Sequence, residues 1–200
     1  MISNKIAGVS GIAHVASNLS FDPDPHKVIP EVLAGVKSLL KSAAAEPSVK
    51  RFVYTSSSAA TTLSAPETKK HIDTHTWNEE AIAKAWAPPP YEKERAPAVY
   101  AASKTEAEKA VWKFVEEEKP GFVANAILPN CNFGKILVKG MRASTGGFVT
   151  ALWNGNTAPL KEFPARMFFL LRDILLLLDT DNKQNGLSTF KTPLVFTLQL

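Results

Sequence analysis

Three short stretches of this chain are apolar without the alternation that a half-exposed strand shows. They cover residues 11–17, 51–57 and 122–128, with the sequences Gly-Ile-Ala-His-Val-Ala-Ser, Arg-Phe-Val-Tyr-Thr-Ser-Ser and Phe-Val-Ala-Asn-Ala-Ile-Leu. Strands that are buried on both faces of a parallel sheet have this continuous apolar character. The pattern therefore predicts three strands of one parallel sheet.

Helical periodicity fills the segments between these strands. Before the second strand, apolar residues recur three and four positions apart, at Val32, Leu33, Val36, Leu39, Leu40 and Ala43. Pro30 fits the first turn of this helix, and the Glu-Pro pair at residues 46–47 ends it. A second helix is predicted over residues 97–119, from a proline to the residue before a Pro-Gly pair.

This order of elements predicts an α/β fold with a parallel sheet and right-handed crossovers. In such sheets ligands bind beyond the carboxyl ends of the strands. Those ends are the Ala-Ser pair at 16–17, the three serines at 56–58 and the Pro-Asn pair at 129–130, and we expect them to form a pocket floor. The loop-rich insertion at residues 59–96 is expected to be a lid or substrate wall beside it.

Composition narrows the class of protein. With 200 residues, 45% of them hydrophobic and 21% charged, the chain suits one soluble globular domain. The net charge of +4 includes no block of consecutive Lys or Arg, which argues against a nucleic-acid partner. The single cysteine, Cys131, cannot form an internal disulfide, so a reducing, cytoplasmic location is expected.

No segment suggests a membrane partner or a secretory signal. The first residues lack an apolar region of the kind that signal peptides contain. The most apolar stretch, residues 167–178, is split by Arg172 and Asp173, and it is shorter than the roughly 20 residues of a bilayer span. We expect it to be a buried strand followed by a helix.

The candidate chemistry begins with Tyr100 and Lys104. Four-residue spacing places both side chains on one face of a helix, where a cation would stabilise phenolate. The phenol, with an ordinary pKa of about 10, would then become a usable proton donor or acceptor near neutral pH. A hydroxyl from the serine run at 56–58 could hold a carbonyl oxygen nearby.

Simpler interpretations stay open for each of these features. A Tyr-x-x-x-Lys sequence alone is usually a surface pair, and a serine run can simply end a strand. His71 and His75 have the spacing of helical metal ligands, but they lie in a polar loop beside Asp73 without a Glu-bearing motif. We therefore predict no metal site.

Four segments in this order resemble the extended short-chain dehydrogenase/reductases, especially the group with fungal aldehyde/ketone reductases and plant dihydroflavonol reductases. They are residues 11–17, 48–57, 99–106 (Val-Tyr-Ala-Ala-Ser-Lys-Thr-Glu) and 127–130 (Ile-Leu-Pro-Asn). The resemblance covers roughly residues 6–155 and implies a doubly wound, Rossmann-like sheet. It also implies an NADP cofactor, with NAD possible, and a small carbonyl substrate.

The resemblance implies a role for each motif residue. Tyr100 would protonate the carbonyl oxygen as hydride arrives from the nicotinamide, and Lys104 would bind the nicotinamide ribose and lower the pKa of the tyrosine. Ser57 would be the catalytic serine, ahead of Ser56 and Ser58. The expected cofactor-binding residues are Val15, Ala16, Ser17, Thr55, Ser56, Tyr100, Lys104, Pro129 and Asn130.

One departure from the family is large. The Gly-x-x-Gly-x-x-Gly turn that receives the cofactor pyrophosphate is missing, because Gly8 and Gly11 precede a strand and no third glycine follows in spacing. The first strand here would correspond to the fourth strand of the family, so we expect an N-terminally truncated chain. Residues 12–16 would then form a bare strand edge that is prone to self-association.

The resulting expectation is a single incomplete Rossmann-like domain. Residues 1–58 would be its cofactor-side strands and helix, 59–97 an insertion, 98–134 the catalytic helix and following strand, and 135–200 a partial substrate-side region. The favoured activity is NAD(P)H-dependent reduction of a ketone or aldehyde. A non-catalytic remnant or interaction module, and a nucleotide-sugar epimerase/dehydratase, are the alternatives.

Overall fold

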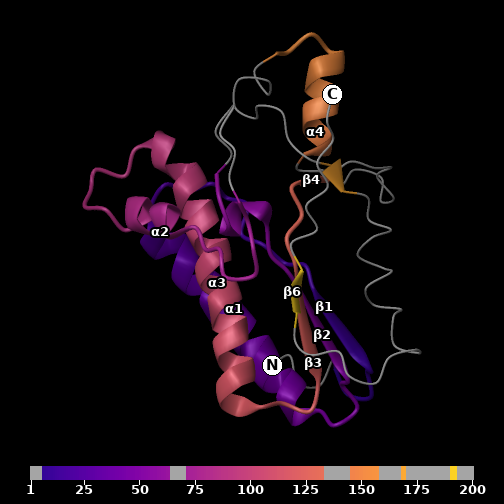
Figure 1. Ribbon diagram of the computed structural model, residues 1–200. Coiled ribbons are helices and arrows are strands. Elements are labelled where there is room, and N and C mark those ends of the chain that lie inside the picture. Colours follow the sequence, from indigo (N-terminus) through magenta and orange to yellow (C-terminus); the bar gives the residue numbers. More distant parts are fainter. Residues whose placement is uncertain (1–5, 64–70, 133–144, 158–167, 170–189, 193–200) are drawn as a thin grey trace.

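A parallel sheet forms the centre of the computed structural model, which describes residues 6–63, 71–132, 145–157, 168–169 and 190–192. Its strands are β1 (Gly11–His14), β2 (Arg51–Thr55), β3 (Val123–Ile127) and β6 (Phe190–Thr192), in the order β1-β2-β3-β6 (Figure 1). All three strand pairs are parallel, which confirms the predicted sheet. Each predicted strand ends earlier than its apolar run, because the last residues of the run turn into the loop at the carboxyl edge.

The register aligns the buried positions of neighbouring strands. Ile12 of β1 lies opposite Phe52 of β2, and Phe52 lies opposite Ala124 of β3. β6 joins β3 through Asn125 and Phe190, an extension of the sheet that the apolar pattern did not predict. β1 has one neighbour in the described sheet, as expected for an edge strand.

Two long helices cover one face of the sheet. They are α1 (Pro25–Ala45) and α3 (Ala96–Glu118), which run side by side along it in Figure 1. The main core lies between these helices and the strands and consists of Ile6, Ile12, Val36, Leu40, Ala43, Val49, Phe52, Tyr54, Ala107, Val111, Phe122 and Ala124. The periodic apolar residues of both helices therefore face the sheet, because burial of that stripe is what stabilises an amphipathic helix on a sheet.

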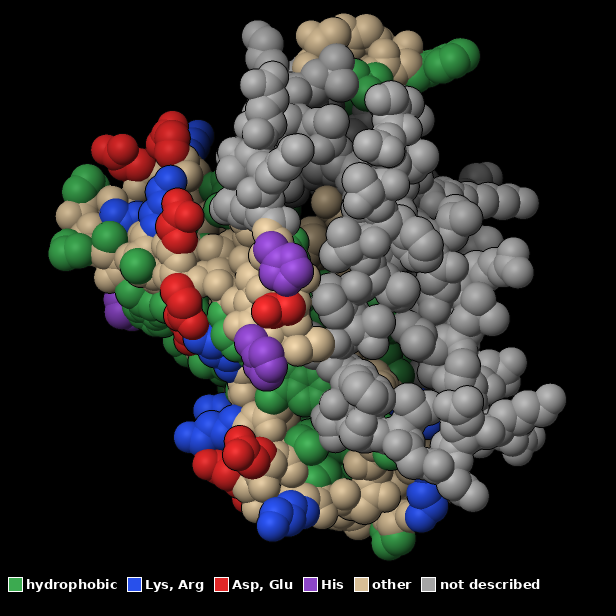
Figure 2. Space-filling model, viewed as in Figure 1, with side chains coloured by type: hydrophobic (Ala, Val, Ile, Leu, Met, Phe, Trp, Pro, Cys, Tyr) green, Lys and Arg blue, Asp and Glu red, His purple; other side chains and the backbone are tan. Residues whose placement is uncertain are grey.

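The outer surface of this helical layer is charged and mixed in sign. In Figure 2, acidic and basic side chains alternate over it instead of gathering by sign. Among the described residues, no helix is long and apolar enough to cross a bilayer.

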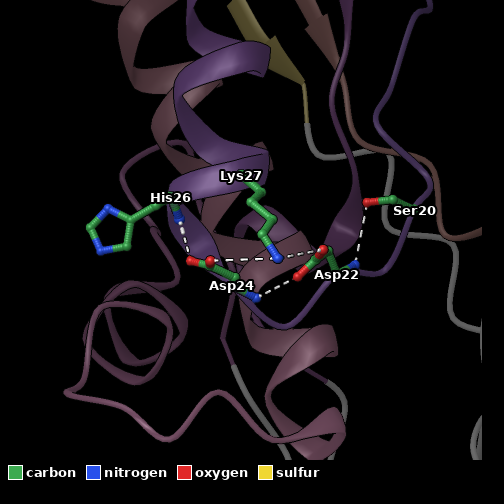
Figure 3. Close-up of polar contacts among 5 residues, drawn as sticks. All are labelled: Ser20, Asp22, Asp24, His26 and Lys27. Atoms are coloured by element: carbon green, nitrogen blue, oxygen red, sulfur yellow. Dashed lines mark hydrogen bonds and ion pairs between the residues drawn. The ribbon is translucent and has the colours of Figure 1, made fainter.

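Asp24 begins α1 and shifts its start from the predicted position. Its Oδ1 accepts the backbone N–H of His26 at 3.0 Å, and its own N–H donates to Asp22 Oδ1 at 2.9 Å. Figure 3 shows the Lys27 ammonium between the carboxylates of Asp22 and Asp24, at 3.5 and 3.8 Å. The prediction that Pro30 occupies the first turn was wrong, because this cap starts the helix at Pro25 and leaves Pro30 inside it.

Asp24→Ala is expected to lower the free energy of unfolding by about 1 kcal/mol, the usual effect of losing an N-cap. Asp24→Asn keeps an oxygen acceptor for the His26 N–H and is expected to lose far less. Urea unfolding followed by circular dichroism measures both. Equal losses in the two variants would assign the stabilisation to the ion pair with Lys27 instead of the cap.

The insertion contains more regular structure than its sequence predicted. It includes two short 3-10 helices, η2 (Ser58–Ala60) and η3 (Lys93–Arg95), and the helix α2 (Glu79–Ala85). Asn78 caps α2 by accepting from the Ala81 N–H at 3.0 Å and also donates to the Ala59 carbonyl at 2.8 Å. One buried amide thus ties the insertion to the segment that follows β2.

The remaining described elements follow β3 in the chain. β4 (Cys131–Asn132) pairs in parallel with β5 (Phe168–Phe169) in a separate two-stranded sheet, and α4 covers Gly146–Trp153. Only residues 168–169 of the predicted strand and helix at 167–178 are described, and both are strand. The rest of that prediction, and most of the proposed region 135–200, lie outside the described residues.

Candidate active site

Ser57 and Tyr100 meet where β2 ends beside the first turns of α3. Ser57 follows the strand and caps η2, because its Oγ accepts the backbone N–H of Ala59 at 3.2 Å. The same side chain lies close enough to the Tyr100 hydroxyl to act on its pKa, which it lowers. Two of the three predicted catalytic side chains are therefore neighbours, although they are separated by more than forty positions in the sequence.

Lys104 lies one helical turn further along α3 and is almost fully buried, with 3% of its surface exposed. Its ammonium donates to the Ser17 hydroxyl, in the loop after β1, and to the Thr55 carbonyl at 3.1 Å. The same nitrogen lies 5.9 Å from the centre of the Tyr54 ring. The lysine thus joins the carboxyl ends of β1 and β2, and it brings together Ser17 and Thr55, two of the residues predicted to bind cofactor.

Burial makes the Lys104 ammonium less basic than an ordinary lysine. Desolvation lowers its pKa to about 8, and the negative charge of Glu108 opposes this shift. The Lys104 charge in turn adds to burial in lowering the pKa of His14, on β1. Lys104 is therefore mainly cationic at neutral pH, but it titrates within the range of ordinary buffers.

The pKa of Tyr100 moves upward from its ordinary value. Burial is the largest cause, and the hydrogen bond from Ser57 acts in the opposite direction. The expectation that Lys104 lowers this pKa was wrong for this arrangement, because burial outweighs the opposing effect, which comes from Ser57. At neutral pH the phenol therefore carries its proton, which is the state that a proton donor needs.

The three neighbouring serines are distinguished by their partners. The Ser56 hydroxyl donates to Glu108 Oε2 at 2.6 Å, away from the Tyr100 hydroxyl, and the Ser58 N–H donates to the Pro129 carbonyl at 2.8 Å. Of the three, Ser57 is the one whose side chain acts on the pKa of Tyr100, so its catalytic role stays a prediction. The bond to Pro129 also places the end of β3 beside the serine run, with Pro129 buried and Asn130 half-buried.

Glu108 is a site residue that the sequence analysis missed. It has no exposed surface, and both of its oxygens accept hydrogen bonds, from Ser56 at 2.6 Å and from Trp112 Nε1 at 3.3 Å. Its position four residues after Lys104 was the available signal, because that spacing puts it on the same helix face.

Apolar side chains form the outer rim of this site. Phe21 is 51% exposed, and its ring centre lies 5.6 Å from that of Tyr100. Val15 is 57% exposed, and Ala16 is also exposed. These two predicted cofactor-binding residues are thus accessible, in the loop that carries Ser17 to Lys104.

The residues present fit one end of a nicotinamide cofactor. Thr55 Oγ1 is buried and has no hydrogen-bond partner among the described residues, although it belongs to the residue whose carbonyl holds Lys104. A bound group with polar atoms at this strand end would satisfy it. The glycine-rich turn that would receive a pyrophosphate is not in the sequence, so the fit covers the nicotinamide side alone.

The two histidines with metal-like spacing lie away from this site. His71 and His75 are exposed in the loop before α2, where Asp73 Oδ1 accepts the His75 backbone N–H at 2.9 Å. Figure 2 shows histidine side chains on the surface of this face. Within the described ranges, no three His, Cys, Asp or Glu side chains are grouped to hold a metal ion.

Comparison with known proteins places this geometry in a family. The NAD-binding family described as Male sterility protein matches residues 2–126. NAD-dependent epimerase/dehydratase terH of Aspergillus terreus is 42% identical over 84% of this chain and 50% of its own length. Aldehyde reductase 2 of Sporidiobolus salmonicolor is 41% identical over 86% of this chain and 51% of its own length. The chain spans about half the length of the curated relatives it matches.

Solved structures share the fold over a similar extent. Vestitone reductase from alfalfa, Medicago sativa, has a TM-score of 0.60 at 25% identity and covers 90% of this chain and 54% of its own. Yeast methylglyoxal/isovaleraldehyde reductase, solved with NADPH, has a TM-score of 0.61 at 24% identity, over 86% and 53%. From the family match and these relatives together, the chain belongs to the extended short-chain dehydrogenase/reductases, within the NAD-binding family described as Male sterility protein.

Proposed function

We propose that this chain supplies the proton-donating half of an NADP(H)-dependent reductase of ketones or aldehydes. The observation that carries the proposal is the placement of Ser57 beside Tyr100, with the buried Lys104 one turn further along α3. The relatives named as aldehyde reductase and ketoreductase support it. The cofactor-binding role of residues 15–17, 55–56 and 129–130 is part of the same proposal.

Ser57 and Tyr100 would act on the same oxygen of the substrate. A carbonyl oxygen that approaches the pair accepts a hydrogen bond from the Ser57 hydroxyl and one from the Tyr100 hydroxyl. NADPH, when bound, supplies the hydride to the carbonyl carbon. As negative charge develops on the oxygen, it becomes a stronger base than phenolate, so the Tyr100 proton transfers to it and the alcohol forms. The Ser57 hydroxyl then stabilises the phenolate that remains.

Lys104 would organise the cofactor side of this reaction. Its ammonium already bridges Ser17 and the Thr55 carbonyl, so it lies where a ribose hydroxyl could replace one of these partners. Tyr100, whose pKa is raised by burial, enters the reaction as the protonated phenol. The raised resting pKa of Tyr100 does not oppose this role, because the phenol must be protonated before each turnover.

The experiment that tests the proposal compares two proteins. One is this chain, and the other is a fusion of the N-terminal half of Sporidiobolus salmonicolor aldehyde reductase 2 to it. NADPH binding is measured by fluorescence titration, and turnover by NADPH oxidation with aromatic ketones and keto-esters. We expect the fusion to bind and turn over NADPH.

A variant of the fusion carries Ser57→Ala and tests the role of this hydroxyl. Loss of one hydroxyl that stabilises the reacting oxygen is expected to reduce kcat about 10²-fold, with NADPH affinity little changed. A folded fusion that binds NADPH but reduces none of these carbonyls would contradict the proposal. If the Ser57→Ala variant has the same kcat as the parent fusion, Ser57 takes no part in the proposed reaction.

Experiments on the same two proteins distinguish the proposed function from two alternatives. β1 is an edge strand of the described sheet, and this favours an interaction module that self-associates through it. That alternative predicts particles larger than a monomer in light scattering and no NADPH binding by this chain. The relative named epimerase/dehydratase favours a nucleotide-sugar reaction instead, which would leave the amount of NADPH unchanged over many turnovers.

A further inference from the structure

Glu108 is a buried carboxylate that the proposed reaction does not use. Removing an ionised carboxylate from water costs several kcal/mol unless hydrogen bonds and an opposite charge compensate for it. Glu108 has both of its oxygens engaged, by Ser56 on β2 and by Trp112 on its own helix. Because the Trp112 indole can only donate and Ser56 donates as well, this arrangement suits the ionised carboxylate.

The location of Glu108 links three parts of the site. Tyr100, Lys104 and Glu108 succeed one another at four-residue intervals on α3, so they share its inward face. The Ser56 hydroxyl that Glu108 holds belongs to the residue directly before Ser57. A carboxylate at this point therefore holds the side chain of the residue next to Ser57, and it shares a buried environment with the ammonium.

We propose that Glu108 is a positioning residue of this site. Its buried carboxylate anchors the serine-bearing end of β2 to α3, and it is the counter-charge of the Lys104 ammonium. The anchoring rests on the 2.6 Å bond from Ser56, and the counter-charge on the shared helix face and on the burial of both groups. Only the importance of Lys104 for catalysis rests on the proposed function; the anchoring and the charge pairing do not.

The groups that face the Lys104 ammonium define its electrostatic environment. On its own helix this is Glu108, on β2 the Tyr54 ring, and on β1 His14, whose pKa responds to Lys104. Of these, Glu108 alone is negative at neutral pH, and its charge raises the pKa of Lys104 against the effect of burial. Without that charge, we expect the pKa of Lys104 to fall further, so that more of it is the neutral amine at a given pH.

The test follows the titration of Lys104 itself. Lysine labelled with ¹³C at Cε is incorporated into this chain, and the Lys104 resonance, assigned as the signal missing from Lys104→Arg, is followed by NMR from pH 6 to 10. In the wild-type chain we expect a midpoint of about 8. Glu108→Gln retains the shape and the acceptor for Ser56 but loses the charge, so the midpoint is expected to fall by about one pH unit.

Glu106→Gln is the matched control. Glu106 lies on the same helix and also accepts from a tryptophan, Trp86 Nε1 at 2.7 Å, but it is outside the buried cluster. The Lys104 midpoint is expected to stay unchanged in this variant. Ser56→Ala, which keeps the charge of Glu108 and removes the 2.6 Å bond, is expected to lower the urea midpoint of unfolding without moving the Lys104 titration.

An unmoved Lys104 midpoint in folded Glu108→Gln, with only the stability reduced, would overturn the proposal. If that variant does not fold, Glu108→Asp withdraws the charge by one methylene, and a smaller fall of the midpoint is expected, with no fall contradicting the proposal. A Ser56→Ala chain as stable as wild type would contradict the anchoring. Because this readout needs neither cofactor nor turnover, it can succeed where the fusion protein shows no reductase activity, and the two failures remain distinguishable.

Discussion

Tyr100→Phe in the fusion with an upstream dinucleotide-binding half is expected to reduce carbonyl reduction by about 10³-fold, within the range that general acid catalysis contributes. The substitution removes the proton that the alkoxide needs and also the hydroxyl on whose pKa Ser57 acts. The ring is retained, so its contact with Phe21 and the packing of α3 should survive. NADPH affinity is therefore expected to stay within a few-fold of the parent while kcat collapses.

Tyr91→Phe is the matched control for this experiment. Tyr91 packs under the Arg95 guanidinium, 5.0 Å from its ring centre, in the segment before α3 and apart from the serine run. Loss of its hydroxyl should leave turnover unchanged. Steady-state NADPH oxidation and fluorescence titration measure both variants, and turnover that persists in Tyr100→Phe would end the assignment of this residue as proton donor.

Lys104→Met is expected to show that the buried ammonium destabilises the fold at neutral pH. The folded pKa of Lys104, about 8, lies below the ordinary value of 10.5, so the unfolded chain binds its proton more tightly between these values. The unfolding free energy contributed by this group therefore rises as pH increases from 8 toward 10.5. Relative to the Met variant, wild type is expected to gain about 2 kcal/mol between pH 7 and pH 10.

Urea unfolding of both chains at pH 7, 8, 9 and 10 measures this difference. The series stops at pH 10, because burial raises the pKa of Tyr54 and of Tyr100, and these groups reverse the trend once unfolded tyrosines ionise. The control, Lys37→Met, replaces an exposed lysine of α1 and should show no such pH-dependent gain. A constant difference between wild type and Lys104→Met would mean that the ammonium is not desolvated.

Local sequence was sufficient to predict the elements that carry the site. Continuous apolar runs identified β1, β2 and β3, and the Pro-Gly pair after Lys119 marked the end of α3 correctly. It misplaced the start of α1 at Pro30, because the competing signal, the Asp24 cap before Pro25, is a short hydrogen-bonding pattern instead of an apolar one. It gave no indication of β6, whose pairing with β3 depends on a contact far away in the chain.

By itself, the sequence determined that Tyr100 and Lys104 share a helix face and that Ser57 lies at a strand end, since both follow from local periodicity. Only the tertiary structure decided which serine meets the phenol, where the ammonium points, and that Glu108 lies beneath them. The reason is that a hydrogen-bond partner and a pKa depend on burial and on charges brought together across β2 and α3. Those distances are set by packing of the whole sheet against its helices, which no local stretch of sequence encodes.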